Sequence, residues 1–258
     1  MAYSTIPKGS LYMNTKLYAG NGNARSITGV GFQPDWVWIK NRTISANHAL
    51  FDVIRGATEV LNSNATTAEA TEAQMLTAFG SDGFSVGTDS TVNDNGSNIV
   101  SWNWKANGAG SANTEGSVSA TVSANTTAGF SIVQYNTAGS GTQTMGHGLG
   151  SAPTFIITKP AQNTESWYVY IPTGVSTSLR LNTDAAAVSS TPYAGTPTDT
   201  LFSINNGVIG GYTDVISYCF RDVKGYSKFG SYVGNSSTDG TFVYTGFKPA
   251  FVIIKRTD

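Results

Sequence analysis

Aromatic side chains are the residues of this sequence whose type and spacing best suit recognition. Trp167, Tyr168, Tyr170 and Tyr193 lie within one short stretch of the chain, and tryptophan and tyrosine each combine a flat apolar ring with a polar group. Such rings stack on the faces of sugars when they are exposed. These four residues are therefore the candidate contacts for a ligand or a partner, and packing against a neighbouring module is the use that we favour for them.

The sequence offers little material for catalysis. His48 and His147 are its two histidines, and neither has a serine or cysteine nucleophile at a recognisable motif spacing. Glycoside hydrolysis needs two carboxylates that face one sugar bond, and no two of Asp35, Asp52 and Asp82 form an evident pair. We therefore predict no catalytic residues and a protein that is not an enzyme.

Oxygen-rich and glycine-rich stretches do not match known ion or phosphate sites. The stretch from Asp89 to Asn95 is rich in Asp and Asn, but it does not have the spacing of a calcium-binding loop. The glycines of Gly20-Asn-Gly22 are not followed by a predicted helix, as a phosphate loop requires. We interpret both as solvated turns and predict no metal site and no cofactor.

A repeat organises the whole chain. The phrase Pro-x-aromatic followed by three residues and a lysine ends at Lys40, Lys159 and Lys255. Residues after the phrase also match between the first two occurrences, at a separation of 118: Gly56 with Gly174, Leu61 with Leu179, Asn64 with Asn182 and Phe84 with Phe202. Self-similarity at a steady separation is typical of tandem structural units.

The repeat also separates packing residues from candidate site residues. Four tryptophans have large apolar counterparts that lack an indole, which predicts core positions. They are Trp36, Trp38, Trp102 and Trp104, aligned with Phe155, Ile157, Tyr218 and Phe220. Trp167 differs from them, because a constant separation aligns it with Ala49 and gives the second repeat an aromatic cluster that the first lacks.

The hydrophobic pattern predicts an all-β protein of tandem antiparallel β-sandwich modules, jelly-roll or lectin-like. Trp36-Val-Trp-Ile39 is a continuous apolar run, typical of a strand that is covered on both faces. Val100, Trp102 and Trp104 alternate with polar residues, as a half-buried strand does.

Two local signals add detail to the first repeat. Thr66 stands three residues before Glu69 in the spacing of a helix capping box, which indicates a helix over 68–79. Asn95-Gly96 separates the stretch 83–86 from the next predicted strand, and this dipeptide suits a hairpin turn between them.

These patterns divide the chain into four parts. We expect a first β-sandwich module over 1–108, a linker rich in Gly, Ser, Thr and Asn over 109–128, a second module over 129–225 and the start of a third over 226–258. The linker contains Ser117–Ser123, which could form an edge strand. Because the third part is too short to close a core, we expect a fragment of a longer polypeptide, with completion of a sheet by another copy as the alternative.

Composition excludes several classes of protein. The net charge is −1 with both signs interspersed, unlike the basic surface of a nucleic-acid-binding protein. The sequence has no apolar run long enough to span a membrane and no secretion signal at its start. A single cysteine, Cys219, allows no internal disulfide and is compatible with assembly in a cytoplasm.

Long phrases of the first repeat resemble a repeat of virion proteins from tailed bacteriophages, particularly marine ones. The phrases begin at Tyr18, Ile27, Leu50, Ser81 and Ser101, and the ending from Thr245 to Asp258 is similar to the opening of that family's final module. The resemblance implies a structural or tail-fibre-type protein with lectin-like β-sandwich modules, and it implies no catalytic residues.

Three functions remain open at this point. The first is a virion structural protein, a tail fibre, appendage or decoration protein assembled in the host cytoplasm, whose partners are other virion proteins and itself, with a trimer as the expected oligomer. The second is a carbohydrate-binding, lectin-like module for host attachment. The third, which we favour least, is a polysaccharide depolymerase.

Overall fold

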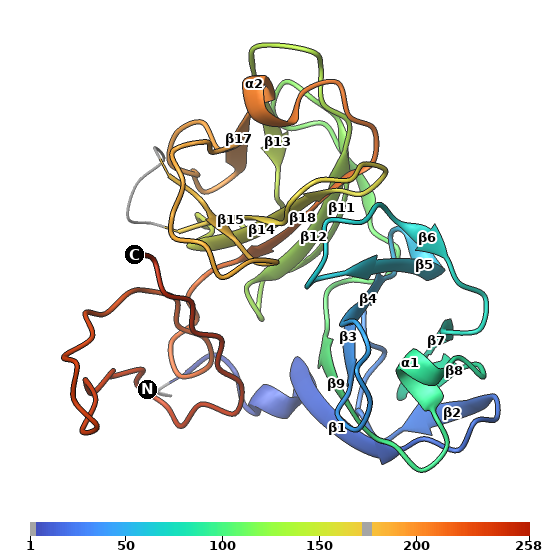
Figure 1. Ribbon diagram of the computed structural model, residues 1–258. Helices are drawn as coiled ribbons and strands as arrows, with labels where there is room; N and C mark the ends of the chain where they lie inside the picture. Colours follow the sequence, from blue (N-terminus) through green and yellow to red (C-terminus); the bar gives the residue numbers. More distant parts are fainter. Residues whose placement is uncertain (1–3, 172–176) are drawn as a thin grey trace.

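The computed structural model describes residues 4–171 and 177–258, and within these ranges the protein is almost entirely β (Figure 1). The strands of the described residues form four sheets, and every pairing between these named strands is antiparallel. The helical elements of this part of the chain are single turns, namely η1 (Gly9–Leu11), α1 (Ser90–Asn93) and α2 (Asn206–Ile209). The predicted all-β sandwich class is confirmed.

The first repeat forms a large sheet and a small one. The large sheet has the order β1-β9-β3-β4-β5-β6, with β1 (Met13–Ala19), β9 (Asn98–Trp104), β3 (Trp36–Asn41), β4 (Ala49–Asp52), β5 (Gly56–Asn62) and β6 (Ala70–Thr71). The small sheet has the order β2-β8-β7, with β2 (Arg25–Thr28), β8 (Gly83–Val86) and β7 (Leu76–Gly80). A core that includes Val37, Phe51 and Phe84 fills the space between the two sheets.

The second repeat has the same plan. Its large sheet has the order β10-β11-β12-β18-β14-β15-β16, with β10 (Ser111–Asn113), β11 (Ala120–Asn125), β12 (Phe130–Tyr135), β18 (Val215–Phe220), β14 (Phe155–Pro160), β15 (Tyr168–Tyr170) and β16 (Leu179–Arg180). The small sheet pairs β13 (Thr142–Gly146) with β17 (Leu201–Asn205). Its internal core includes Ile156, Tyr170 and Phe202.

Strand order shows how closely the two repeats correspond. The order β1-β9-β3-β4-β5 in the first recurs as β12-β18-β14-β15-β16 in the second, and α1 and α2 occupy the same place before the last strand. The second repeat differs by carrying β10 and β11 outside β12, whereas β1 is an edge strand. Both added strands lie in 109–128, the segment that the sequence predicts to be a linker.

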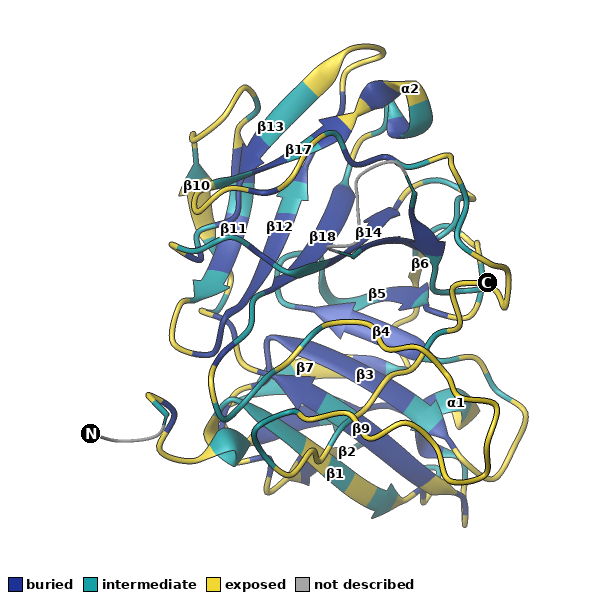
Figure 2. Ribbon diagram, turned by 90° about the vertical axis from the view of Figure 1, so that its left-hand side faces the viewer, coloured by how far each residue is buried: buried dark blue, intermediate teal, exposed yellow. Residues whose placement is uncertain are grey.

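The two large sheets pack face to face, so the molecule has four layers. A third core lies between these sheets, and it takes side chains from β3, β4, β5 and β9 on one side and from β12, β14, β15 and β18 on the other. Figure 2 shows the strands on both sides of this contact as mostly buried. We call this core the repeat interface.

Burial between layers explains the continuous apolar runs. In β3, Trp36 and Trp38 point into the repeat interface, while Val37 and Ile39 point into the internal core of the first repeat. The strand is therefore covered on both faces, as predicted. The core prediction is confirmed for Trp36, Trp38 and Trp104, while Trp102 is half-buried at the rim of the interface, where its ring contacts Phe251.

Two local predictions for the first repeat are wrong. Residues 68–79 form β6, a turn and β7 instead of a helix, because 70–71 pair with β5 and the Glu69 carboxylate bonds to Arg55. These tertiary contacts outweigh a local capping signal. The strands on either side of Asn95-Gly96 also do not form a hairpin, since β8 pairs with β2 and β7 while β9 pairs with β1 and β3.

The C-terminal segment, residues 229–258, contains no assigned helix or strand. It runs as an open loop beside the two large sheets (Figure 1) and is mostly exposed (Figure 2). Phe229 stacks on Phe155 with ring centroids 5.1 Å apart, and Phe251 meets Trp104 edge-on at 5.4 Å. Across 4–171 and 177–258, no helix is long and apolar enough to cross a membrane.

Candidate functional site

Side chains that could bind a ligand or take part in a reaction gather at the repeat interface. At its centre the ring of Trp36 stacks on that of Tyr218, with centroids 4.3 Å apart and planes 20° apart. Trp104 from the first repeat and Phe130 from the second also contact Trp36, at 4.4 and 5.7 Å. Large stacked rings bury much apolar area and contribute further through their geometry. The interface is therefore built on an aromatic centre to which both repeats contribute.

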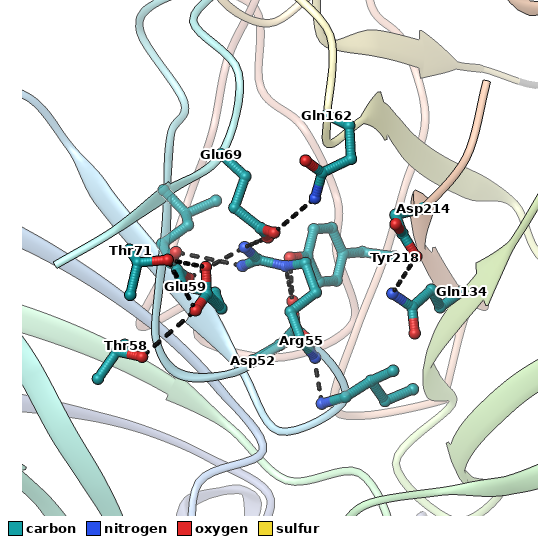
Figure 3. A network of polar contacts seen from close by, with 12 residues as sticks. Asp52, Arg55, Thr58, Glu59, Glu69, Thr71, Gln134, Gln162, Asp214 and Tyr218 are labelled. Carbon is teal, nitrogen blue, oxygen red and sulfur yellow. Dashed lines mark hydrogen bonds and ion pairs between the residues drawn. The ribbon is translucent and has the colours of Figure 1, made fainter. Parts of the chain in front are cut away.

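A polar network adjoins this aromatic centre (Figure 3). The Tyr218 hydroxyl donates to the Asp52 carboxylate over 2.7 Å, which joins β18 of the second repeat to β4 of the first. Arg55 Nε donates to the same carboxylate oxygen over 2.6 Å, and Arg55 Nη1 donates to Glu69 over 2.6 Å. One guanidinium therefore bridges two carboxylates beside a tyrosine that comes from the other repeat.

The turn after β4 positions this network. The second oxygen of Asp52 accepts the backbone N–H groups of Ile54 and Arg55, which folds the chain back at once. Gly56 follows with φ 117°, in the left-handed region that favours glycine. Arg55 also donates to the carbonyls of Leu50 and Glu59 on the flanking strands. The guanidinium is thus held by the strand pair that carries its carboxylate partner.

Burial makes this network costly to disrupt. The side chains of Asp52 and Arg55 are almost fully inaccessible. Burial by itself lowers the pKa of Arg55, but the Asp52 and Glu69 carboxylates more than offset this and hold it above its usual value. Burial, and next the Asp52 carboxylate, raise the pKa of Tyr218, so its hydroxyl remains a donor. Removing one partner of such a buried pair destabilises the fold strongly, because the other charge is left buried and unpaired.

A second set of polar bonds crosses the repeat interface around residues 62–69. The Glu69 backbone N–H donates to the Ala161 carbonyl over 2.7 Å, and the Glu69 carboxylate accepts from Gln162 over 3.0 Å. The Trp167 indole N–H donates to the Asn62 carbonyl over 2.8 Å. These bonds attach the end of β5 and the chain after it to the β14–β15 loop of the second repeat.

Lys159 adds a buried cation to this contact. Its side chain is 0% exposed, and its ammonium lies 3.2 Å from the Thr66 carbonyl of the first repeat. It also donates to the carbonyls of Asn163 and Glu165 in its own loop. Burial lowers the pKa of Lys159 to about 8, a shift that the Glu165 carboxylate opposes. The lysine of the repeated phrase thus closes the β14–β15 loop and also contacts the other repeat.

The structure separates the four predicted contact residues. Trp167 is buried in the repeat interface, whereas Tyr168, Tyr170 and Tyr193 are buried in the internal core of the second repeat. Neighbours along β15 point to opposite faces, so Trp167 and Tyr168 diverge. The Tyr193 hydroxyl lies within hydrogen-bond distance of Thr158 and of two carbonyls. Stacking on a sugar needs an exposed ring face, and these rings pack against protein instead.

Strand register corrects the counterpart of Trp167. The backbone N–H of Trp167 donates to the Asn182 side chain, and that of His48 donates to the Asn64 side chain. Because Asn64 and Asn182 are matched positions, Trp167 corresponds to His48 and not to Ala49. The chain is one residue shorter between Lys159 and Gly174 than between Lys40 and Gly56, so a constant separation misplaces this strand by one residue.

Both histidines serve local structure. Nδ1 of His48 accepts the Trp38 indole N–H over 2.9 Å, and burial lowers the pKa of His48. Nδ1 of His147 accepts the Leu149 backbone N–H over 3.2 Å, and burial lowers the pKa of His147 as well. Both rings are therefore neutral at pH 7 with one nitrogen used as an acceptor.

The three aspartates considered for glycoside hydrolysis lie in different settings. Asp35 is buried and accepts the Ala106 backbone N–H, and burial raises its pKa. Asp82 is on the surface, where the N–H groups of Gly31 and Gly29 lower its pKa. Asp52 is bonded within the interface network. None of them faces another of the three in a hydrogen bond among the described residues.

Comparison with known proteins gives one family. A family model described as a domain of unknown function, DUF7483, matches residues 8–258. The chain belongs to this family. No curated protein and no solved structure matches it. The DUF7483 match runs through both repeats and the C-terminal segment, so the unit that the family describes includes the whole repeat interface.

Sequence reasoning missed the polar residues of this interface. The predicted site residues do not include Arg55, Lys159 and Tyr218, although these lie in or beside matched positions of the repeat, nor Glu69, which lies in the stretch predicted to be a helix. One signal was present: Asp52 and Arg55 stand three apart, directly before a glycine, in a stretch that otherwise favours burial. Over 4–171 and 177–258, no group of three or more His, Cys, Asp or Glu side chains could hold a metal ion.

Proposed function

We propose that this chain is a structural protein of a bacteriophage virion, a tail fibre, appendage or decoration protein in which two β repeats act as one rigid block. The observation that carries this proposal is the repeat interface. The aromatic rings and the buried ion network that could have served a ligand or a reaction are used to join the repeats.

The arrangement suits a mechanical role. A four-layer stack with three cores resists relative movement of its repeats, because sliding would break the Tyr218–Asp52 bond and the stacking on Trp36. The resemblance of the repeated phrases to virion proteins of tailed bacteriophages supports a place in the particle. In this proposal the chain assembles in the host cytoplasm with other virion proteins and with itself as a trimer, the symmetry that we expect for a fibre or appendage.

Mass spectrometry of purified particles tests the proposal. We expect peptides of this chain to co-sediment with infectious particles through a density gradient, in a copy number that is a multiple of the oligomer. Antibody fragments against the chain should then label one defined place on the particle in electron micrographs. A chain that is monomeric at micromolar concentration and absent from washed particles would refute the proposal.

Activity and binding assays separate the other two candidate functions. A depolymerase would release sugars from host capsule or lipopolysaccharide, and we expect no turnover. A lectin-like module would bind particular glycans on an array. Because the side chains of Trp167 and Tyr193 are buried, we expect Trp167→Phe and Tyr193→Phe to give the same set of bound glycans as the original chain.

A further inference from the structure

We infer that the C-terminal segment is a strand-pairing surface that accepts one kind of partner, a β-strand with the pattern of β9 and β18. The inference rests on strand pairing in the two complete repeats and on the exposure of matching residues in residues 229–258. It goes beyond the proposed virion role and does not depend on it.

The opening strands of each repeat pair with strands that come later in the same repeat. β1 pairs with β9, β2 with β8, and β3 with β4 and β9. In the second repeat β12 pairs with β18, β13 with β17, and β14 with β15 and β18. Within the described residues, no opening strand of either repeat pairs with another opening strand of that repeat. β9 and β18 occupy the central place between the first and third opening strands.

The C-terminal segment carries the counterparts of these opening strands. Phe251-Val-Ile-Ile254 follows Pro249 as Trp36-Val-Trp-Ile39 follows Pro34, and so corresponds to β3. Tyr232-Val-Gly-Asn corresponds to Tyr18-Ala-Gly-Asn at the end of β1. The segment therefore repeats both neighbours of β9, and it forms no strand in the structure.

Residues of the C-terminal segment are exposed where their counterparts in the two repeats are buried. Val252 and Ile254 are 62% and 69% exposed, whereas their counterparts Val37 and Ile39 are both 0% exposed. Tyr232 is 48% exposed, whereas Tyr135 at the matching place in the second repeat is 3% exposed. A run of β-branched residues with unpaired backbone is a template for strand addition.

The segment is already held near its two ends. Phe229 and Phe251 pack on the rim of the repeat interface, and the Lys255 ammonium donates to the carbonyls of Thr183 and Ala185. Anchored ends reduce the entropy lost when the segment pairs with a strand. The partner is specified by the two known examples, Val100-Ser-Trp-Asn-Trp104 and Ile216-Ser-Tyr-Cys-Phe220, in which large apolar residues alternate with small or polar ones.

A synthetic peptide tests this inference on the full chain. The peptide has the sequence of residues 96–106, which spans β9, and a scrambled peptide of the same composition is the control. We expect the β9 peptide to bind the chain and to slow amide hydrogen exchange in the two stretches 229–233 and 251–255. A peptide of residues 213–222, which spans β18, should protect the same stretches.

Matched variants assign the binding to the predicted strand. Val252→Asp places a charge where both repeats bury an aliphatic side chain, and we expect it to weaken peptide binding by about tenfold or more. Phe242→Ser is the control, because Phe242 corresponds to Ile27 of β2, which pairs with β8 and not with β9. Both side chains are exposed, so both variants should fold.

Several outcomes would overturn the inference. Equal protection by the β9 and scrambled peptides would show that pairing is not specific. Protection confined to residues 13–19 and 36–41 would mean that the peptide replaces β9 within the first repeat. Protection of the C-terminal segment without peptide, increasing with protein concentration, would show that the segment pairs with the same segment of a second copy and not with a strand of the β9 type.

Discussion

The two repeats have the same strand order, yet corresponding residues play different parts in joining them. Tyr218 and Trp102 occupy the same place in β18 and β9 and point to the same face of their sheets. Tyr218 lies at the centre of the repeat interface, where it stacks on Trp36 and donates to Asp52. Trp102 lies at the rim and is covered by Phe251 of the C-terminal segment. The interface is therefore not symmetric, although the repeats are alike.

This difference shows that the fold of a repeat and the docking of repeats depend on different residues. Residues shared by the copies, such as Leu61 and Leu179, build each large sheet and its apolar face. Residues that differ between the copies determine how the faces meet: the register of β15 places Ile171 where the first repeat has Asp52. Asp52 and Arg55 pair within the first repeat, so the bond that favours one docking arrangement is the one that Tyr218 donates to Asp52: a misaligned face would bury this carboxylate without that donor.

Removing the Arg55 side chain, which pairs with Asp52 at the repeat interface, should have the largest effect on stability. Arg55→Ala leaves the buried Asp52 carboxylate without its cation, and we expect a loss of about 3–5 kcal/mol in the free energy of unfolding. Guanidinium chloride denaturation followed by tryptophan fluorescence measures it. The matched control is Lys228→Ala, which removes a largely exposed ion pair with Asp222 and should cost less than about 1 kcal/mol. Equal losses for the two variants would contradict the role given to burial.

Removing one hydroxyl should have the next largest effect. Tyr218→Phe keeps the stacking on Trp36 but loses the hydrogen bond to a buried carboxylate, and we expect a cost of about 1.5–3 kcal/mol. The same denaturation experiment applies, with Tyr244→Phe as the control because Tyr244 is largely exposed. If Tyr218→Phe were as stable as the original chain, the Tyr218–Asp52 bond would not contribute to docking.

The sequence predicts the elements better than their assembly. The continuous apolar run at 36–39 predicted a strand covered on both faces, and β3 is such a strand. Alternation at 100–104 predicted a half-buried strand; β9 is present, but the half-buried pattern is wrong, because Ser101 and Asn103 are 0% exposed and the strand is covered on both faces. Comparison of the repeats also predicted a core position for Trp36. These features depend on local pattern, which a single sequence contains.

Docking could not be predicted in the same way. Asp52 and Tyr218 are 166 residues apart in sequence. The apolar pattern of a strand predicts that a sheet face is buried, but it does not identify the face that packs against it. Trp167 illustrates a second limit, because the chain is one residue shorter between Lys159 and Gly174 than between Lys40 and Gly56, and this moves its counterpart from Ala49 to His48. The helix predicted from the capping box at Thr66 is absent for a physical reason as well, since the Glu69 carboxylate accepts a hydrogen bond from Arg55 instead of capping a helix.

Lys159 should make the stability of the interface depend on pH. The folded state releases this proton near pH 8, whereas an unfolded lysine keeps it to about pH 10.4. Between these values the unfolded state binds more protons, so stability rises with pH. Relative to Lys159→Met, the original chain should gain about 1 kcal/mol between pH 7.5 and 9. Denaturation curves at both pH values measure the difference, and parallel behaviour of the two proteins would contradict the lowered pKa.

Substitution of Trp102 should have the smallest effect on the free energy of unfolding. Trp102 is the residue of the first repeat that matches Tyr218 of the second. Trp102→Phe keeps an aromatic ring against Phe251, whose centroid lies 5.7 Å away, and removes indole area that is only half-buried. We expect a cost of about 0.5–1 kcal/mol, within the range of a single aromatic contact. Combining Trp102→Phe with Phe251→Ala in a double-mutant cycle measures the contact itself. A loss as large as that of Tyr218→Phe would show that the rim and the centre contribute equally, and the docking of the repeats would then be closer to symmetric than this structure indicates.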